Sequence, residues 1–264
     1  MTFIEILEYL LLGIVQGLTE FLPVSSSGHL VLLKDILGIT DRYDSNFLVL
    51  FDVLLHFATL IAVCFYFSKD ILQIFKPPYK TLLYLVIATL PAAVIMYFAK
   101  DYVDLIFGGS YLCFAFLITA LLLLATELLL KNKNVSGGGI DGKKSIIMGF
   151  AQGVAVIPGI SRSGSTICAG LIAEGDRENV AKFSFLMSIP VILGSSVVSL
   201  FEFKAAAYNF APLLIAMLAA FLSAFFAIKL MMKVIQKVNF KWFALYLSAL
   251  SALTFIDSFV YNIW

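Results

Sequence analysis

The feature that most constrains this chain is a series of apolar stretches, each about as long as a membrane is thick. A helix needs roughly 18 or more apolar residues to cross the hydrocarbon core. Three stretches of that length contain no charged residue: 81–99, 183–201 and 205–228. Three more have a similar length with one or two polar insertions: 46–67, 110–130 and 242–263. The sequence therefore predicts about six transmembrane helices.

The composition supports this reading. Of the 264 residues, 61% are hydrophobic and only 13% are charged, whereas a soluble domain is nearer a quarter charged. The N-terminus has Glu5 and Glu8 where a removable signal peptide would have basic residues. A net charge of +1 gives no indication of a nucleic-acid partner. The three cysteines lack metal-ligand spacing, so we expect neither a disulfide framework nor a metal cage of Cys and His.

Two polar segments, at about 10–30 and 147–173, share a repeated pattern. Residues Gly13 to Gly17 recur as Gly149 to Gly153, 136 positions later, with Gln16 over Gln152. The same register aligns Ser25 with Ser161, Ser27 with Ser163 and Gly28 with Gly164, and it places Pro23 one position from Pro158. Three apolar stretches follow each copy. We therefore expect one membrane domain, residues 1–264, built from two repeats of about 1–132 and 133–264.

Three spans is an odd number, so the second repeat must be inserted upside down relative to the first. Basic residues test this prediction, because they are retained on the cytoplasmic side. If the loop after the first span is cytoplasmic, thirteen basic residues lie on that side, four lie on the other and only Arg162 is left over. The thirteen are Lys69, Lys76, Lys80, Lys131, Lys133, Lys143, Lys144, Arg177, Lys182, Lys229, Lys233, Lys237 and Lys241, and the four are Lys34, Arg42, Lys100 and Lys204. This bias predicts both termini on the outer side.

The two polar segments contain too much Gly, Pro and Ser to be simple spans. Proline removes a helical hydrogen bond and glycine loosens the backbone. In lipid, the freed backbone groups must be buried in protein or face a water-filled cavity. We therefore predict two re-entrant helical hairpins that enter from opposite faces and meet near the middle, as in transporters with inverted repeats. The expected fold class is an all-α polytopic membrane protein with an inverted-topology repeat.

The second polar segment has an arginine, Arg162, inside otherwise apolar sequence. Arginine at the centre of a transmembrane helix costs roughly 2.5–3.5 kcal/mol on insertion scales, so we expect an anion to offset that cost. Its planar guanidinium matches phosphate oxygens, and Ser161, Ser163 and Thr166 would add donors at a helix N-terminus. The alternative is a pair with a buried carboxylate such as Glu20, which need not exclude phosphate binding.

The first polar segment contains acid, base and hydroxyl groups. Gln16 and Glu20 are four residues apart, so on a helix they share a face. Their oxygens are suited to a hard divalent cation whose shell the substrate's phosphates would complete. His29 can act near neutral pH as base, acid or nucleophile. The other candidate nucleophiles or donors are Ser25, Ser26 and Ser27.

Polar residues inside the expected spans have weaker functional signals. Asp52 and His56 are four residues apart, and two readings stay open: they face the polar site, or they pair across the bundle. Glu127 is expected to pair with Lys131, one turn away. Asp257 is expected to be solvated near the outer interface.

The chain resembles the undecaprenyl pyrophosphate phosphatases, also called bacitracin-resistance proteins, over its whole length. That family is marked by E/Q-x-x-x-E followed by a Ser-rich stretch that ends in Gly-His, and by P-G-x-S-R-S-x-x-T. Here the first motif is Gln16 to Glu20 followed by Pro23 to His29, and the second is complete from Pro158 to Thr166. Gln16 lies within the family pattern, but it leaves one carboxylate in this motif and so weakens a two-carboxylate metal site.

The resemblance implies hydrolysis of undecaprenyl pyrophosphate to undecaprenyl phosphate and inorganic phosphate. This reaction recycles the lipid carrier for cell-wall synthesis and confers resistance to bacitracin. The resemblance also implies a protein of the bacterial plasma membrane, with its active site open to the outer side. It implies dependence on a divalent cation, Mg²⁺ or Ca²⁺, for which the matching residues are Glu20 and Gln16.

On this reading each candidate residue has an expected role. Arg162, with the hydroxyls of the second segment, would hold the pyrophosphate, and Ser25 and Ser27 would add donors. Glu20 would hold the metal or deprotonate the attacking group. His29 would be the nucleophile, or the general base for Ser26 or water. The sequence leaves the nucleophile open.

The alternative function is a secondary transporter or flippase for a phosphorylated lipid, because broken helices in inverted repeats are typical of that class. The joint presence of Glu20, His29 and Arg162 favours an enzyme, since anion transport needs the arginine but no acid–base group. A purely structural scaffold is disfavoured, because burying this polar cluster without a ligand would be costly. The metal, the preferred chain length and the oligomeric state, a homodimer included, stay open.

Overall fold

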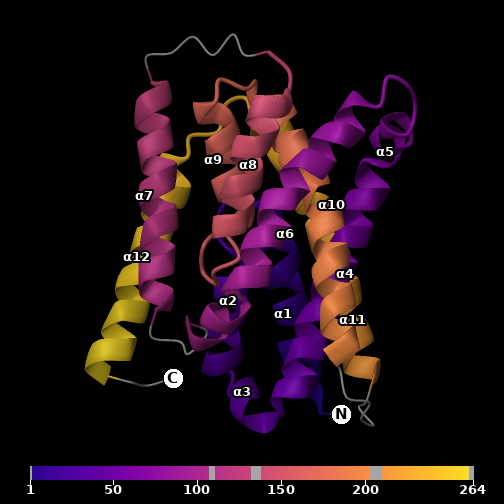
Figure 1. Ribbon diagram of the computed structural model, residues 1–264. Coiled ribbons are helices and arrows are strands. Elements are labelled where there is room, and N and C mark those ends of the chain that lie inside the picture. Colours follow the sequence, from indigo (N-terminus) through magenta and orange to yellow (C-terminus); the bar gives the residue numbers. More distant parts are fainter. Residues whose placement is uncertain (1, 107–110, 132–137, 203–209, 262–264) are drawn as a thin grey trace.

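The computed structural model of the protein describes residues 2–106, 111–131, 138–202 and 210–261. Within these ranges the regular secondary structure is helical, and most of the helices run along one common axis (Figure 1). The helices are α1 (Phe3–Phe21), α2 (Ser26–Ile36), α3 (Ile39–Arg42), α4 (Ser45–Tyr66), α5 (Ser68–Ile74), α6 (Lys80–Ile106), α7 (Leu112–Leu130), α8 (Gly142–Val154), α9 (Arg162–Ile172), α10 (Arg177–Glu202), α11 (Phe210–Val234), α12 (Lys241–Ile256) and the π-helical turn η1 (Asp257–Tyr261).

Among the described residues, six helical segments are long and apolar enough to cross a membrane. They are Ser45–Tyr66, Lys80–Phe98, Leu112–Leu130, Arg177–Ser199, Phe210–Val234 and Lys241–Phe259. All six coincide with the predicted apolar stretches, which confirms an all-helical, polytopic membrane protein. The first residues of stretches 110–130 and 205–228, and the last of 242–263, lie outside the described residues.

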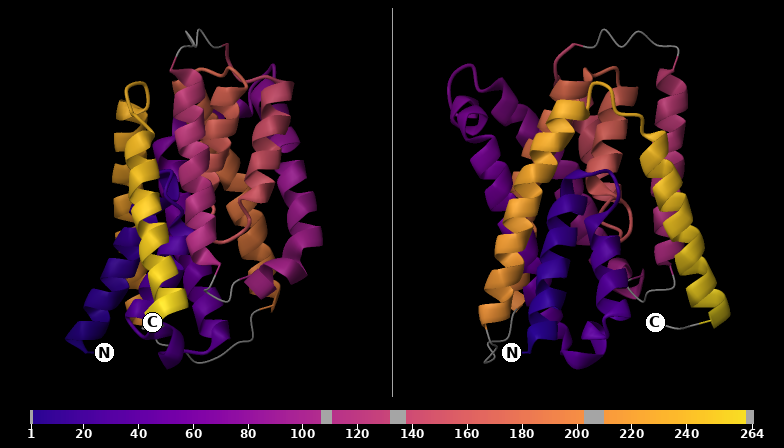
Figure 2. Two further views of the ribbon diagram at one scale, coloured as in Figure 1. Left: turned by 90° about the vertical axis from the view of Figure 1, so that its left-hand side faces the viewer. Right: turned by 180° about the vertical axis from the view of Figure 1, so that it is seen from behind.

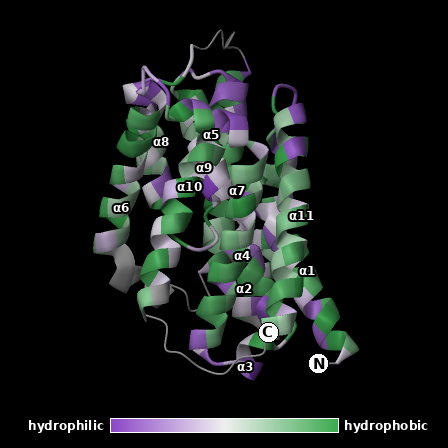
Figure 3. Cartoon of the chain, turned by 90° about the vertical axis from the view of Figure 1, so that its right-hand side faces the viewer, coloured by the Kyte–Doolittle hydropathy of each residue, from purple (hydrophilic) through white to green (hydrophobic). Residues whose placement is uncertain are grey.

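The flanks of the bundle are largely apolar, and polar residues gather toward its ends (Figure 3). One stripe of exposed apolar side chains follows α11 at four-residue intervals: Leu214, Leu218, Leu222, Phe226 and Leu230. A monomer in water rarely exposes so large an apolar surface. Lipid as the surrounding solvent accounts for it.

Side-chain caps set where several helices begin. Thr2 and Glu5 form a capping box at α1, and Asp44 accepts the backbone N–H of Phe47 at the start of α4, at 2.7 Å. Asp141 caps α8 outside the membrane spans. Hydrogen bonds from the backbone and side chain of Lys144 hold the pKa of Asp141 below its usual value.

Both predicted polar segments form helical hairpins. α1 and α2 are joined by a turn at residues 22–25, and α8 and α9 by a turn at residues 155–161. The two hairpins come from opposite ends of the bundle, and their turns lie near the middle of its height (Figure 2). Their insertion into a membrane as re-entrant elements, and the repeat boundary near residue 132, stay predictions.

Each hairpin packs against a spanning helix of the other half of the chain: α1 lies along α11, and α8 lies along α6. Glycine permits both contacts. A Cβ atom at Gly13 would lie 2.2 Å from the carbonyl oxygen of Ala216, and one at Gly149 would lie 2.5 Å from that of Ala88. Close approach at small residues is the usual way for helices to associate in lipid.

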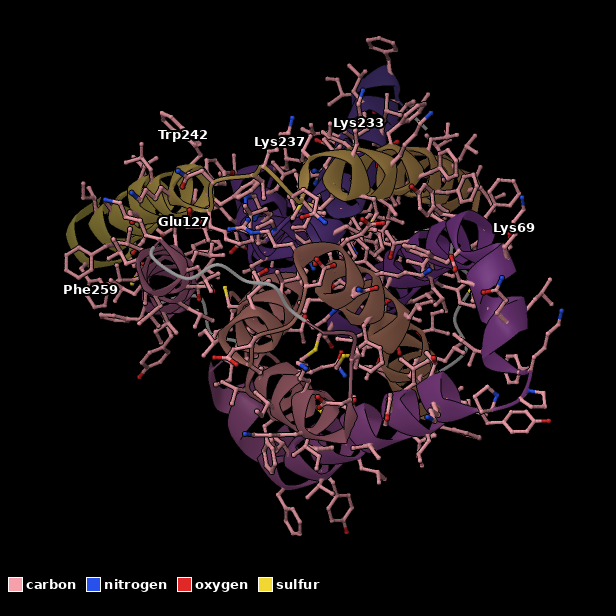
Figure 4. The ribbon with its side chains drawn as sticks, turned by 90° about the horizontal axis from the view of Figure 1, so that it is seen from above. Lys69, Glu127, Lys233, Lys237, Trp242 and Phe259 are labelled. Atoms are coloured by element: carbon pink, nitrogen blue, oxygen red, sulfur yellow. The ribbon has the colours of Figure 1, made fainter. Side chains whose placement is uncertain are left out.

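The two ends of the bundle differ. The N-terminal helix begins, and η1 ends, at the same end of the molecule (Figure 1). Seen from the opposite end, Lys69, Lys233 and Lys237 lie around the periphery (Figure 4). Basic side chains of α5, of the end of α11 and of the connection after it therefore lie at the end that is remote from the start of α1.

Two expectations outside the site are wrong. Glu127 lies 3.7 Å from the guanidinium of Arg177 and accepts a hydrogen bond from the backbone N–H of Phe240, so its partners come from tertiary contacts and not from Lys131. Asp257, at the start of η1, is only 4% exposed, so it is buried and not solvated.

Candidate active site

Two helix N-termini meet in the interior. α2 begins at Ser26 and α9 begins at Arg162, and the serine before each helix is its cap. The Ser25 hydroxyl accepts the N–H of Gly28 at 3.3 Å, and the Ser161 hydroxyl accepts the N–H of Gly164 at 3.0 Å. The N-terminal end of a helix carries partial positive charge. An anion between the two hairpin turns would therefore meet two favourable dipoles.

Reciprocal hydrogen bonds hold the hairpin turns together. The Ser27 hydroxyl accepts the backbone N–H of Gly159 at 3.4 Å. The Ser163 hydroxyl donates to the backbone carbonyl of Leu22 at 2.9 Å. Ser27 and Ser163 are equivalent in the repeat register, so each hairpin uses the same serine to contact the other's turn.

The turns approach so closely because two positions lack a side chain. A Cβ atom at Gly28 would lie 3.0 Å from the Cα atom of Gly159, and one at Gly164 would lie 3.3 Å from the Cβ atom of Pro23. The Gly-rich and Ser-rich character of the two motifs therefore has a structural cause, which is the contact between the hairpins.

A buried ion pair lies beside these turns. Arg162 donates from Nη2 to Oε1 of Glu20 at 2.6 Å and from Nη1 to the carbonyl of Ser184 at 3.4 Å. The side chain of Glu20 is 5% exposed and that of Arg162 is 15% exposed. The structure thus shows the pairing that the sequence offered as the alternative to an anion. The pair joins the two hairpins directly.

Three more groups lie close to the second carboxylate oxygen of Glu20. Oε2 accepts the hydroxyl of Ser26 at 2.5 Å and the side-chain amide of Gln16 at 3.1 Å. Nε2 of His56 lies 3.6 Å from the same oxygen. The amide oxygen of Gln16 is buried and has no hydrogen-bond partner among the residues that the structure describes.

These oxygens fit a hard divalent cation that completes its shell with phosphate and water. Glu20 supplies a carboxylate, and the unpartnered oxygen of Gln16 points to a missing neighbour. Within the described parts of the chain, no three His, Cys, Asp or Glu side chains are grouped so as to hold a metal. A cation here would therefore depend on the substrate for much of its coordination.

Thr166 lies one turn into α9 and is fully buried. Its hydroxyl lies 2.6 Å from the hydroxyl of Ser184 and donates to the carbonyl of Arg162 at 2.9 Å. Thr166 thus connects α9 to α10 immediately behind the arginine. Ser184 was not among the predicted residues, although a serine inside an apolar span was an available signal.

Asp52 and His56 on α4 were expected either to face the polar site or to pair within the bundle, and the structure shows one of these arrangements for each residue. Asp52 pairs with Nζ of Lys34 at 2.8 Å, across the bundle. His56 donates from Nδ1 to the Asp52 carbonyl at 2.8 Å, which turns its Nε2 toward Glu20. His56 therefore lies beside the site, a placement that the sequence left open.

The structure brings Gln16, Glu20, Ser26 and Arg162 into direct contact, but it places the His29 ring elsewhere. Nδ1 of His29 lies 2.7 Å from the carbonyl of Ser25, and Nε2 lies 2.6 Å from the hydroxyl of Tyr246. Tyr246 was not predicted, because nothing local distinguishes a tyrosine in an apolar span.

Fold and site together define a polytopic α-helical membrane protein in which two hairpin turns enclose a carboxylate–guanidinium pair. Residues 9–253 match the protein family described as "Bacitracin resistance protein BacA". The chain belongs to that family.

Several relatives cover nearly the whole chain. A protein of Carboxydothermus hydrogenoformans named undecaprenyl-diphosphatase is 42% identical over 247 residues, which are 90% of this chain and 92% of the relative. Proteins with the same name from Christiangramia forsetii and Methanobrevibacter smithii are 38% and 36% identical. The first covers 92% of this chain and 94% of its own length, and the second covers 96% and 98%.

Proposed function

We propose that this protein is an undecaprenyl-diphosphatase, which hydrolyses undecaprenyl pyrophosphate to undecaprenyl phosphate and inorganic phosphate. The observation that carries the proposal is the meeting of two helix N-termini beside the buried Glu20–Arg162 pair. The names of the relatives support the same reaction. They do not favour the alternative of a transporter or flippase.

Binding of the pyrophosphate would use donors from both hairpins. Arg162 donates one N–H to Glu20 and one to the Ser184 carbonyl, and no other described residue accepts from it, so its remaining N–H groups would be available to phosphate oxygens. The N-termini of α2 and α9 add backbone dipoles from two directions. Ser27 and Ser163 set the separation of the turns through their hydrogen bonds.

In the hydrolysis, the attacking oxygen forms a bond to the terminal phosphorus as the bond from that phosphorus to the bridging oxygen breaks. Undecaprenyl phosphate leaves, and a water molecule, attacking directly or after Ser26, supplies the oxygen that completes inorganic phosphate. Positioning and charge neutralisation dominate such reactions. Glu20 accepts the Ser26 hydroxyl at 2.5 Å, so this carboxylate is suitably placed to take a proton from Ser26 or from a water in its place. The nearest partner of His29 Nε2 is Tyr246, which favours Glu20 as the first proton acceptor.

We include a divalent cation, Mg²⁺ or Ca²⁺, in the proposal. Glu20 and the unpartnered oxygen of Gln16 would hold it. When bound, the cation supplies charge neutralisation for the pyrophosphate.

The membrane placement is also a proposal. The basic end of the bundle would face the cytoplasm of a bacterial plasma membrane. Both termini and the opening of the site would then lie on the outer side, and the two hairpins would be re-entrant from opposite faces.

The decisive experiment is phosphate release from undecaprenyl pyrophosphate by the purified protein in detergent, where there are no compartments. Wild-type protein should release phosphate. Glu20→Ala, Arg162→Ala and His29→Ala should each reduce the rate at least about a hundredfold, whereas Lys144→Ala, at the exposed end of α8, should not.

Two results would contradict this proposal. Wild-type protein that moves labelled lipid phosphate across proteoliposomes but releases no phosphate would indicate a transporter. Near-normal hydrolysis by all three site variants would remove the assignment of the site.

A further inference from the structure

The imidazole of His29 is held by a hydrogen bond at each ring nitrogen. Nδ1 lies 2.7 Å from the carbonyl oxygen of Ser25. A carbonyl only accepts, so Nδ1 carries the hydrogen. In the neutral ring Nε2 is then the acceptor, and the Tyr246 hydroxyl, 2.6 Å away, is its donor.

The hairpin turn places the Ser25 carbonyl for this contact. Ser25 has φ 70°, in the left-handed region that residues other than glycine rarely adopt. Its carbonyl accepts both the backbone N–H of His29, at 3.2 Å, and Nδ1. Backbone strain of this kind costs about 1–3 kcal/mol and concentrates at functional sites.

Tyr246 comes from a different part of the bundle. It lies on α12, which packs along α7 (Figure 2). The Ser251 hydroxyl of α12 donates a 2.7 Å hydrogen bond to the Cys113 carbonyl of α7. The Tyr246–His29 hydrogen bond therefore ties the α7–α12 pair to the first hairpin.

The aromatic contacts of His29 agree with a fixed ring. The Tyr246 ring lies nearly parallel to the imidazole, with 13° between the planes and 5.7 Å between the centroids. Phe116 of α7 meets the imidazole edge-on, also at 5.7 Å. The ring thus has an aromatic neighbour from each helix of the α7–α12 pair.

We propose that Tyr246 is a positioning residue for His29 in the hydrolysis of the lipid pyrophosphate. The Ser25 carbonyl fixes the tautomer, and the Tyr246 hydroxyl donates to the lone pair on Nε2 and holds the ring in one orientation. This inference rests on the proposed function, because it gives His29 a part in the reaction. Groups that orient a metal-bound histidine typically contribute about 10- to 100-fold, and we expect an effect of that size from a group that orients His29.

The first test is the kinetics of Tyr246→Phe, which keeps the aromatic ring and removes only the hydroxyl. We expect kcat to fall about 10- to 100-fold with KM little changed, because Tyr246 holds the imidazole and not the pyrophosphate. The matched control is Tyr66→Phe, since Tyr66 packs against Phe67 and Phe225. It should behave like wild type.

The second test reads the His29 ring directly. The chain has only two histidines, so nuclear magnetic resonance of protein with isotope-labelled histidine resolves two imidazoles, and a His56→Gln sample assigns them. Wild-type His29 should be in the Nδ1–H tautomer. Tyr246→Phe should shift the Nε2 signal toward that of an imidazole nitrogen that accepts no hydrogen bond, with Nδ1 still protonated. Tyr66→Phe should leave both nitrogen shifts unchanged.

A Tyr246→Phe protein with unchanged kcat, or with unchanged His29 signals, would overturn this inference. A variant that only melts at a lower temperature would show that the contact is merely structural. If wild-type protein releases no phosphate, the proposed function fails first. The resonance experiment then still decides whether Tyr246 donates a hydrogen bond to Nε2 of His29.

Discussion

At the scale of single residues, Glu20 and Arg162 are the contact on which the polar centre depends. Each side chain is almost fully buried. Removing one partner of a buried ion pair destabilises the fold, because the other partner is left as an uncompensated buried charge. Replacing both partners by neutral groups leaves no buried charge. Comparing the single variants with the double variant therefore distinguishes the contribution of the pair to stability from its contribution to hydrolysis.

A double-mutant cycle uses this difference. Glu20→Gln and Arg162→Met should each destabilise the folded protein by about 3–5 kcal/mol, and the double variant should lose clearly less than the sum of the two. Phosphate release should be lost in all three. Thermal unfolding in detergent and the phosphate assay measure the two effects. Strictly additive losses of stability would show that the two residues are not coupled.

The kinds of residue in the site were predictable, but their partners were not. The four-residue spacing of Gln16 and Glu20 predicted a shared helical face, and their side chains are hydrogen-bonded. His56 was left undecided beside Asp52, because helical spacing places both residues on one face and says nothing of what lies opposite. The neighbouring helices decided that question.

At the scale of elements, the hairpins depend on glycines that contact backbone atoms of spanning helices. The repeated Gly-x-x-x-Gly pattern lies in α1 and α8 and faces α11 and α6, respectively. A methyl group at Gly13 or Gly149 has no room, because the nearest atom at each position is a backbone carbonyl oxygen, whereas at Gly17 and Gly153 the nearest atoms belong to the side chains of Ser223 and Ile95.

Alanine at these positions should therefore separate the helices. Gly13→Ala and Gly149→Ala should each lower stability by about 1–3 kcal/mol, as overpacking usually does. The matched control is Gly194→Ala, a helical glycine in α10 with nothing within 4 Å of the added methyl group. It should stabilise slightly, since alanine is the better helix former. Equal melting temperatures for all three variants would contradict the close packing.

The breaks in the hairpins were also predictable from sequence. Proline, glycine and serine clusters predicted interruptions within 10–30 and 147–173, and the turns lie at residues 22–25 and 155–161. The short helices α3 and α5 were not predicted, because brief connections between spans carry little periodic signal.

At the scale of the whole molecule, charge orients the bundle. The start of α1 and the end of η1 lie at one end (Figure 1), and Lys69, Lys233 and Lys237 lie at the other (Figure 4). Lysine and arginine are retained on the cytoplasmic side during insertion. We therefore expect the α3 end of the molecule to face outward.

Single cysteines test this orientation. In a background without Cys64, Cys113 and Cys168, Asp41→Cys should react with a membrane-impermeant thiol reagent in intact cells. Lys143→Cys, at the opposite end, should react only after the membrane is opened. Both residues are exposed in the folded protein. The reverse labelling pattern would place the termini in the cytoplasm.

The sequence by itself determined the number of spans, the places where helices break and the chemical groups available to the site. These properties follow from hydropathy and backbone freedom, which act over a few neighbouring residues. Only the tertiary structure decided which of those groups meet. Glu20 pairs with Arg162 142 positions away, and His29 with Tyr246 217 positions away. Such contacts depend on how distant helices pack, and no local spacing encodes that packing.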